Sequence, residues 1–443
     1  MAGSLLRDRT SHEQARVTYV ELFFDLVFVF AVTQLSHHLL EHLTIAGAAE
    51  TALLLLAVWS VWVYTTWATN WLDTNRAPVR LMLLALTVAG LLVSTSIPEA
   101  LGRHGLTFAI ALAVMHNGRN LFLLWCIGDH DPQSRRSFQR IGFWLALAGL
   151  CWIAGGLAAG SARVTLWALA LLIELGSPWW RYWMPGFGAS AISDWRVSPH
   201  HMAERCGLFM IIALGESILV TGATFGPLEW TAAHVAAFIT AISGSIAMWW
   251  VYFATTADEA AAELASSSDP GRLARNAYTY SHLPMVAGVI LTAVGDELVL
   301  RHPGGPTEPA VLAAIVGGPA LFLFGSATFN RMICGVWPRR SHATSKARPP
   351  PRSKRAAGSR APCRVVRSRR RSSRRSSTLM WTGPASTCSG WTSARCRRPT
   401  MRPTSGWRRG SGSGMSRSTP RGCTGCAESR PIWTRRRWRT PTI

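Results

Sequence analysis

Carboxylates and basic residues placed inside apolar segments are the residues of this chain that could do chemistry. Glu21 and Asp25 lie near the start of the stretch at 17–40, VTYVELFFDLVFVFAVTQLSHHLL, which otherwise reads as a membrane-spanning helix. Their i,i+4 spacing places both on one helix face. A charge inside hydrocarbon costs about 3 kcal/mol or more, so such residues usually face a bundle interior or a cavity. Glu21 and Asp25 either form part of an internal polar site or lie at headgroup depth, solvated or paired with a basic neighbour.

A second polar group lies in the segment at 200–219, HHMAERCGLFMIIALGESIL. Its members are His201, Glu204, Arg205, Glu216 and Ser217. Glu216 follows Arg205 by about 16 Å along a helix, which predicts a position near the bilayer midplane. The small neighbours Gly215 and Ser217 permit a close helix approach or a hydrogen bond. Glu216 therefore either contacts a transported ion or makes a structural hydrogen bond.

Arg119 is the basic residue inside an apolar span, in HNGRNLFLLW, and His116 shares its helix face. It requires an acidic partner unless its long side chain reaches the interface. We expect that partner to be a carboxylate of the other polar groups: Glu21, Asp25, Glu204 or Glu216.

Two further polar residues lie in apolar segments. His282 in YTYSHLPMVAGV precedes Pro284, whose ring frees a backbone carbonyl and suggests a kink beside a cavity. His282 is either a proton carrier or a satisfied packing residue. Glu174 in LLIELGSPWW lies near mid-depth and is followed by a helix-breaking Gly–Ser–Pro.

Several kinds of catalytic site are missing from the sequence pattern. It contains no phosphate-binding loop, no nucleophile elbow and no zinc-ligand spacing. The four cysteines near the apolar segments have no disulfide spacing and read as packing residues. We therefore expect no enzymatic activity, no cofactor and no metal.

Apolar runs of about 20 residues predict an all-α, multi-span membrane protein. Ten spans are expected, at 18–40, 48–68, 79–97, 105–127, 140–159, 163–183, 206–225, 232–254, 277–299 and 309–329. The segments on the same side of the membrane as the amino terminus carry 13 arginines, against 3 in the loops on the other side. Because positive loops stay in the cytoplasm, both ends of the spanning domain are predicted to be cytoplasmic.

The charge of the chain divides it into unlike parts. The formal charge is +23, but residues 338–443 hold 28 basic residues and one acidic residue, Glu428. We expect a cytoplasmic segment at 1–17, a transmembrane domain at 18–337 and a disordered basic tail at 338–443. Few Lys and many Arg, Ser, Pro, Trp and Cys indicate GC-rich codons read out of frame. The alternative is a basic arm for anionic lipid or nucleic acid.

Short matches between spans six apart suggest an internal repeat. WVYTTWAT at 62–69 resembles WVYFATTA at 250–257, and AGLLVSTSIPEAL at 89–101 resembles AGVILTAVGDELV at 287–299. An even offset makes the two halves parallel repeats, related by an axis along the membrane normal. The first half then has six spans and the second four.

Three motifs together resemble the bacterial low temperature requirement protein A family: ELFFDLVFVFAVTQLS at 21–36, HxxERxGLFxIIALGESIL at 201–219 and YSHLPMVAGV at 280–289. The resemblance covers residues ~16–337. It implies a polytopic inner-membrane protein linked to growth in the cold, with no settled biochemical activity. In that family the helical region continues past the position of Trp337, where this sequence changes composition.

These observations favour a transporter or channel-like protein in which the ten polar residues converge on one internal site. The residues are Glu21, Asp25, His116, Arg119, His201, Glu204, Arg205, Glu216, Ser217 and His282. Permeation gives buried charges a reason to persist. The alternative is a non-transporting scaffold needed for membrane homeostasis in the cold. The expected partners are the lipid bilayer and a small solute or ion rather than nucleic acid; the sequence leaves the substrate and the oligomeric state open.

Overall fold

The computed structural model describes residues 5–7, 16–129, 131–191, 197–254, 263–264, 267, 269–306 and 308–334. Structural statements below concern these residues. The basic tail predicted at 338–443, and the frameshift inferred for it, lie outside them and stay predictions.

The described part of the chain is helical and contains no strand. Its elements are α1 (Tyr19–Glu41), α2 (Ile45–Thr69), α3 (Ala77–Ser96), η1 (Ile97–Glu99), α4 (Gly105–Ile127), α5 (Pro132–Leu157), α6 (Gly160–Gly176), α7 (Pro199–Phe225), α8 (Ala232–Phe253), α10 (Pro270–Ala274), η3 (Arg275–Tyr280), α11 (His282–Arg301) and α12 (Pro309–Cys334). The all-α fold expected from the apolar runs is confirmed.

Several helices begin at residues that suit a helix start. The hydroxyl of Thr44 accepts the N–H of Gly47 at 3.0 Å at the start of α2. The carboxylate of Asp131 accepts the N–H of Ser134 at 3.0 Å at the start of α5. Such caps satisfy backbone donors that have no partner within the helix. Proline occupies the first turn of α5, α7 and α10, where no N–H is required.

Among the described residues, nine helical segments are long and apolar enough to cross a membrane. They match nine of the ten predicted spans. The sixth, predicted at 163–183, is the 17-residue α6, Gly160–Gly176. It rises about 26 Å, somewhat less than a bilayer core of about 30 Å. The chain then turns, with Arg181 and Tyr182 in the left-handed region at φ 54° and 49°.

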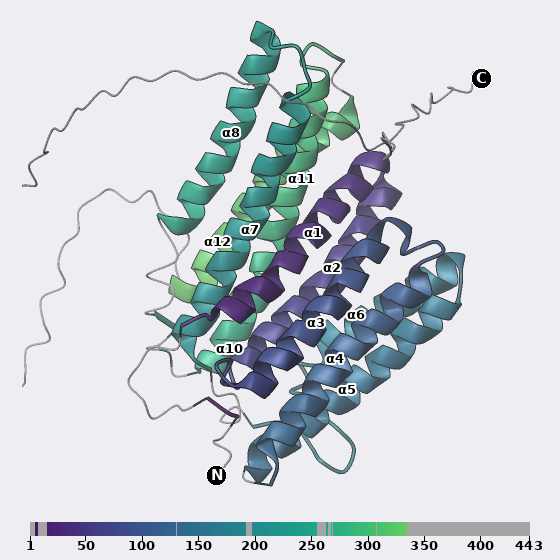
Figure 1. The fold of residues 1–443 in the computed structure, drawn as a ribbon, viewed down its shortest axis with the longest axis vertical. Coiled ribbons are helices and arrows are strands. Elements are labelled where there is room, and N and C mark those ends of the chain that lie inside the picture. The colour runs from purple at the N-terminus through teal and green to yellow at the C-terminus, as the bar shows by residue number, and fades with distance from the viewer. Residues whose placement is uncertain are drawn as a thin grey trace, which may run out of the picture. The chain divides into compact units, whose positions relative to one another are not determined.

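The helix contacts agree with the predicted repeat. In the first half, α1 packs on α2 and α3, and α4 packs on α2 and α3. In the second half, α7 packs on α8 and α11, and α12 packs on α8 and α11. Figure 1 shows the two groups side by side, coloured purple to blue and teal to green. α5 and α6 extend the first group, and no described helix is their counterpart in the second.

Packed aromatic rings join the two groups in the interior. The ring of Phe209 on α7 lies 4.3 Å from that of Trp62 and 5.5 Å from that of Trp59, both on α2. All three side chains are buried. Trp59 also donates its indole N–H to the carbonyl of Thr279 at 2.8 Å. These contacts fix the middle of α2 against α7 and η3.

α11 and α12 approach each other through glycines spaced seven residues apart. A Cβ added to Gly288 would lie 2.5 Å from the backbone nitrogen of Phe322. A Cβ on Gly318 would lie 2.5 Å from the hydroxyl oxygen of Thr292, and one on Gly325 would meet the backbone of Met285 at 2.8 Å. The close approach therefore depends on the missing side chains.

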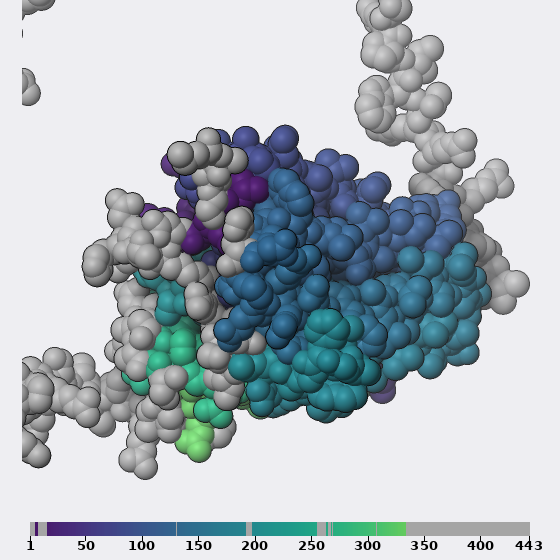
Figure 2. Space-filling model, turned by 90° about the horizontal axis from the view of Figure 1, so that it is seen from below, coloured from purple at the N-terminus to yellow at the C-terminus, as the bar shows by residue number. Residues whose placement is uncertain are grey.

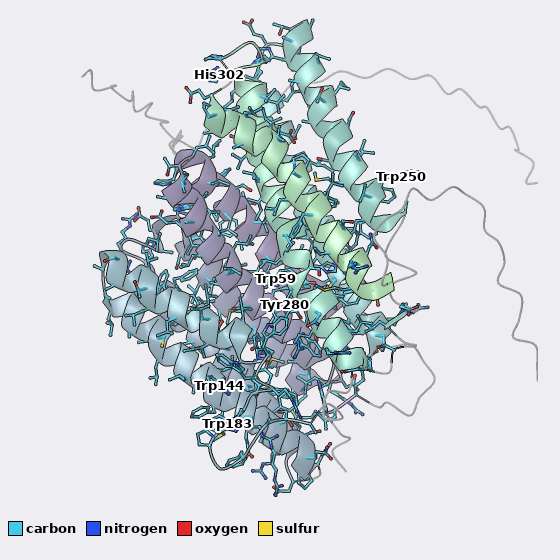
Figure 3. The ribbon with its side chains drawn as sticks, turned by 180° about the vertical axis from the view of Figure 1, so that it is seen from behind. Trp59, Trp144, Trp183, Trp250, Tyr280 and His302 are labelled. Atoms are coloured by element: carbon cyan, nitrogen blue, oxygen red, sulfur yellow. The ribbon has the colours of Figure 1, made fainter. Side chains whose placement is uncertain are left out.

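Exposed tryptophans occur at or just after the carboxyl ends of α4, α6 and α8. They are Trp125, Trp179, Trp180, Trp183, Trp249 and Trp250. Trp250 points away from the bundle in Figure 3. Tryptophan favours the boundary between hydrocarbon and water, so we expect each of these helix ends to lie near a membrane surface. Figure 2 looks onto the end of the bundle where α1 and α7 begin, and there the blue α4–α5 region lies beside the teal segment that follows α6.

Candidate functional site

Asp25 on α1 and Arg205 on α7 form an ion pair with no solvent exposure. Arg205 Nη1 donates to Asp25 Oδ2 at 2.7 Å, and Nη2 donates to Oδ1 at 2.8 Å. The indole N–H of Trp62 donates to the same Oδ1 at 2.9 Å. A bidentate guanidinium–carboxylate pair is strong and directional. Because protein donors occupy both carboxylate oxygens, this pair fixes α1 against α7.

His201 on α7 bridges α2 and α1. The N–H of Ser198 donates to Asn70 Oδ1 at 2.8 Å, which fixes the orientation of the Asn70 amide. The amide nitrogen of Asn70 then donates to His201 Nδ1 at 3.3 Å. His201 Nε2 therefore carries the proton and donates it to Glu21 Oε1 at 2.8 Å. In this arrangement the buried imidazole is neutral.

Glu21 and Glu204 also hold the chain that enters α1. The backbone N–H and the hydroxyl of Thr18 each donate to Glu21 Oε2 at 2.9 Å. The N–H of Val17 donates to Glu204 Oε2 at 2.9 Å. Glu21 thus completes a capping box at the start of α1 while it binds His201. We call Glu21, Asp25, Asn70, His201 and Arg205 the α1–α7 network.

A second buried network links α2, α4, α5 and α6. Its members are Ser60, His116, Arg119, Trp152 and Glu174, and we call it the α4–α6 network. Arg119 Nη2 lies 3.1 Å from His116 Nδ1, and His116 Nε2 lies 3.2 Å from the hydroxyl of Ser60. That hydroxyl donates to Glu174 Oε2 at 2.9 Å, and the Trp152 indole donates to Oε1 at 2.7 Å.

The direction of these hydrogen bonds follows from the donors. A guanidinium only donates, so His116 Nδ1 must accept and the proton of His116 is on Nε2. The Ser60 hydroxyl accepts this Nε2–H and donates its own hydrogen to Glu174 Oε2. His116 Nε2 also lies 3.5 Å from the same carboxylate oxygen. The positive charge of Arg119 and the negative charge of Glu174 thus compensate each other through two neutral groups. All members of the network are at most 2% exposed.

The expectation that Arg119 pairs with a carboxylate of the other polar groups is wrong. Besides His116, Arg119 donates to the hydroxyl of Thr65 at 3.0 Å and lies over the ring of Tyr64. Its carboxylate is Glu174, reached through His116 and Ser60. The reason is helix order, since α2 separates α4 from α1 and α7 at this depth. The ten polar residues therefore do not converge on one site.

Glu216 belongs to neither network. It lines a groove of about 600 Å³ at the carboxyl ends of α1, α7 and α11, together with Thr33, His37 and Glu297. α7 begins at Pro199 rather than 206, so Glu216 lies about 26 Å along this 27-residue helix, past its middle. Its depth in the membrane stays a prediction.

The neighbours of Glu216 differ from the close-packing expectation. A Cβ added to Gly215 would have no atom within 4 Å, so this glycine does not admit a neighbouring helix. The hydroxyl of Ser217 faces that of Ser245 on α8 at 3.0 Å and links α7 to α8. Ser217 therefore makes a helix contact.

His282 is the first residue of α11 and contacts α8 through Tyr252. The hydroxyl of Tyr252 lies 2.8 Å from His282 Nε2, and the carbonyl of Ala277 lies 3.1 Å from Nδ1. A carbonyl only accepts, so Nδ1 carries the proton and Nε2 accepts from Tyr252. Its ring stacks on that of Tyr278 at 5.4 Å. Both ring nitrogens are satisfied, and His282 makes a structural contact here.

A cavity of about 230 Å³ opens at the end of the bundle where α2, α4 and α6 finish. The α4–α6 network contributes Arg119 and Glu174 to its lining. Its walls are aromatic, with Tyr64, Trp67, Trp71, Phe138, Trp179, Tyr182 and Tyr280. Arg119 lies eight residues before the end of α4, or about 12 Å inside the helix. The cavity therefore extends well into the spanning region.

A π-helical turn forms part of the cavity wall. η3 spans Arg275–Tyr280 directly before α11, and Arg275, Thr279 and Tyr280 line the cavity. π-helical turns are rare and occur frequently at functional sites. The kink beside a cavity that the sequence suggests at Pro284 is close to this turn, which ends four residues before the proline. Figure 3 places Tyr280 beside Trp59 in the interior.

Several residues of the cavity and the networks were missing from the predicted site. Glu174 stands out in the sequence as a mid-depth carboxylate, but the predicted site does not include it. Ser60, Asn70 and Trp152 are single polar or aromatic residues in or next to apolar helices. Such a residue rarely shows from the sequence alone whether it belongs to a hydrogen-bond network or only packs. The signal that could have found Glu174 is the charge of Arg119, since a buried cation requires an acid at similar depth. Among the described residues no group of three or more His, Cys, Asp or Glu side chains is placed to hold a metal.

Comparisons with known proteins identify the family. The family model described as bacterial low temperature requirement A protein (LtrA) matches residues 16–347. An uncharacterized protein of Rhizobium meliloti (strain 1021) is 41% identical over 332 residues, which cover 74% of this chain and 80% of that protein. No solved structure matches. The chain belongs to the bacterial low temperature requirement A family and is a multi-pass helical membrane protein.

Proposed function

We propose that this protein moves a small solute or ion across the bacterial inner membrane, as a transporter or channel-like protein without enzymatic activity. The observation that carries the proposal is the cavity, which leads from one end of the bundle to the buried charges of Arg119 and Glu174. Buried ionisable groups within a membrane span commonly mark a substrate or ion pathway. A structural pair of charges needs no access from outside, whereas this pair lines an open cavity.

The groove at the opposite end supports the same function. Glu216 lines the groove, whose walls come from the carboxyl ends of α1, α7 and α11. The rings of Trp59 and Trp62 on α2 pack against that of Phe209 on α7, and in our proposal this contact separates the cavity from the groove. Access from one end at a time, with a packed barrier between, is the arrangement that alternating access requires. Movement of α7 against α2 would open the barrier.

The second candidate function is a non-transporting scaffold, favoured by the α1–α7 network. Asp25 and Arg205 have no solvent exposure, and both carboxylate oxygens of Asp25 accept from protein donors. Such a pair holds helices in register without contacting any solute. This network favours a scaffold, while the cavity favours transport.

The side on which the cavity opens follows from the loop charges. Its mouth carries Arg181, Arg272 and Arg275, which belong to the arginine-rich segments. These segments are predicted to be cytoplasmic, together with both ends of the spanning domain. The cavity is then the cytoplasmic access and the groove the external one.

Flux into proteoliposomes tests transport. The full chain is reconstituted, and uptake of K⁺, Na⁺, H⁺ and benzenesulfonate is followed against protein-free vesicles. We expect uptake of at least one probe, and a loss of that uptake in Glu174→Gln and Glu216→Gln. Arg103→Gln, at a side chain that is 75% exposed, is the matched control and should retain it. Vesicles that match the protein-free ones for every probe would favour the scaffold.

A further inference from the structure

The charges that line the cavity do not balance. Four arginines line it, Arg119, Arg181, Arg272 and Arg275, against the two carboxylates Glu174 and Asp269. Glu174 compensates Arg119 through His116 and Ser60, and Asp269 pairs with Arg272 at 3.3 Å. Arg181 and Arg275 remain, and neither pairs with a carboxylate among the described residues. The described cavity thus has a surplus of two positive charges.

Backbone carbonyls hold the two uncompensated arginines in place. Arg181 donates through Nε at 2.8 Å, and also through Nη2, to the carbonyl of Ser190. Arg275 Nη1 donates to the carbonyl of Pro178 at 2.8 Å. A guanidinium has five N–H groups, so neither arginine has used its full donor capacity in these bonds. Both are positioned cations with N–H groups left to bind an anion.

Aromatic rings accompany the arginines. The guanidinium of Arg275 lies 5.3 Å from the ring of Trp179, which in turn lies 5.6 Å from the ring of Tyr280. Across the cavity wall, Trp71 and Phe138 meet edge to face at 5.3 Å. Aromatic walls alone would also suit an organic cation. The surplus of positive charge opposes a cation and favours an anion.

We propose that this cavity binds a small organic anion that carries an aromatic ring. The anionic group, a carboxylate, sulfonate or phosphate ester, would bind Arg181 and Arg275, and the ring would pack on Trp179 and Tyr280. The volume of about 230 Å³ is below the range of about 300–1,000 Å³ typical of drug-sized ligands, so it suits one ring rather than several. This inference rests on the proposed transport function and names its solute class. Its test measures binding alone, so it does not depend on whether the solute is transported.

Calorimetric titration of the full chain in detergent tests the site with four probes. Benzenesulfonate is the expected ligand, and benzyl alcohol, benzyltrimethylammonium and inorganic phosphate vary its charge and its ring. We expect benzenesulfonate to bind at least about tenfold more tightly than each of the other three. Benzyl alcohol and benzyltrimethylammonium lack the negative charge, and phosphate lacks the ring. No benzenesulfonate binding would overturn the proposal, and so would equal affinity for the neutral or cationic analogue. Equal affinity for phosphate would overturn the aromatic part.

Matched variants locate the site. Arg275→Gln and Trp179→Leu should each weaken benzenesulfonate binding about tenfold, the loss expected of one charge-assisted hydrogen bond or one ring contact. Arg103→Gln and Trp250→Leu change exposed residues of the same types outside the cavity and should bind like the unmodified chain. Equal effects in both pairs would place the binding elsewhere. Binding without flux would leave this inference standing while the transport proposal fails, and flux of another probe without binding would do the reverse.

Discussion

His116 and His201 lie in similar surroundings on different helices. In each, a donor that cannot accept faces Nδ1: the guanidinium of Arg119 for His116 and the amide of Asn70 for His201. In each, Nε2 faces a carboxylate, directly or through a hydroxyl. Both imidazoles are therefore neutral hydrogen-bond relays. The relay explains how Arg119 is buried without touching an acid.

At the residue scale we predict that Arg119 and Glu174 are energetically coupled although they do not touch. Arg119→Met leaves Glu174 as an unpaired buried charge, and Glu174→Gln leaves Arg119 unpaired, so each lowers the free energy of unfolding. The double variant removes both charges and should be less destabilised than the sum of the two. We expect a coupling of about 0.5–3 kcal/mol, measured by thermal unfolding in detergent.

The control for this coupling is the same measurement on Arg119→Met, Asp25→Asn and the double variant that combines them. Asp25 belongs to the α1–α7 network and Arg119 to the α4–α6 network, so their effects should add within about 0.5 kcal/mol. Additive effects for Arg119 and Glu174 would contradict the relay. Strong coupling between Arg119 and Asp25 would contradict the separation of the networks.

At the scale of elements, two pairs of helices are held by different means. α1 and α7 meet through buried ion pairs and hydrogen bonds, while α11 and α12 meet through glycines. Within lipid, apolar surfaces gain little from leaving the solvent, so close packing of small residues contributes much of the association. α12 depends on this contact, since much of its opposite surface is exposed apolar side chain.

We predict that Gly288→Ala separates α11 from α12. The new methyl group would lie 2.5 Å from the backbone of Phe322, which cannot move aside without shifting the helix. Overpacking of this kind costs about 1–3 kcal/mol, to be measured as a lower unfolding temperature in detergent. Gly244→Ala on α8 is the matched control, because a Cβ there meets no atom within 4 Å. That control should be neutral or slightly stabilising, and an equal loss in both variants would contradict the packing argument.

For the whole molecule, the repeated contacts of α1–α4 and of α7, α8, α11 and α12 describe two similar halves. The even offset of six spans places corresponding helices in the same direction. The ends where α1 and α7 begin are then predicted to face the same side of the membrane.

We predict that loops 98–104 and 255–275 lie on opposite sides of the membrane. The arginine asymmetry places 255–275 in the cytoplasm and 98–104 outside. A reporter that fluoresces only in the cytoplasm should give a signal when inserted in loop 255–275 and none in loop 98–104. A reporter active only outside should give the reverse. The same signal at both would contradict the predicted topology and the side assigned to the cavity.

Fold class and span positions could be read from the sequence, because they depend on local properties. A run of about 20 apolar residues must be helical in lipid, since every backbone polar group needs a partner within the segment. This rule located nine of the ten expected spans. It misjudged α6, where the apolar run continues past Gly176 through Trp179 and Trp180 although the helix has ended. Tryptophans at a membrane surface and within a span look alike in sequence.

The polar partners were decided by the tertiary structure. Glu21, Asp25, His201 and Arg205 could be marked from the sequence as polar residues of the interior, because each interrupts an apolar pattern, and all four are buried. The sequence did not show that Glu174 rather than Asp25 would compensate the charge of Arg119, since both acids lie inside apolar spans. Which acid a cation reaches depends on which helices are neighbours, and that order results from many side-chain contacts spread along each helix. The cavity has the same origin: its lining comes from α2, α4, α5, α6, α10 and η3 together, and no single segment carries its pattern.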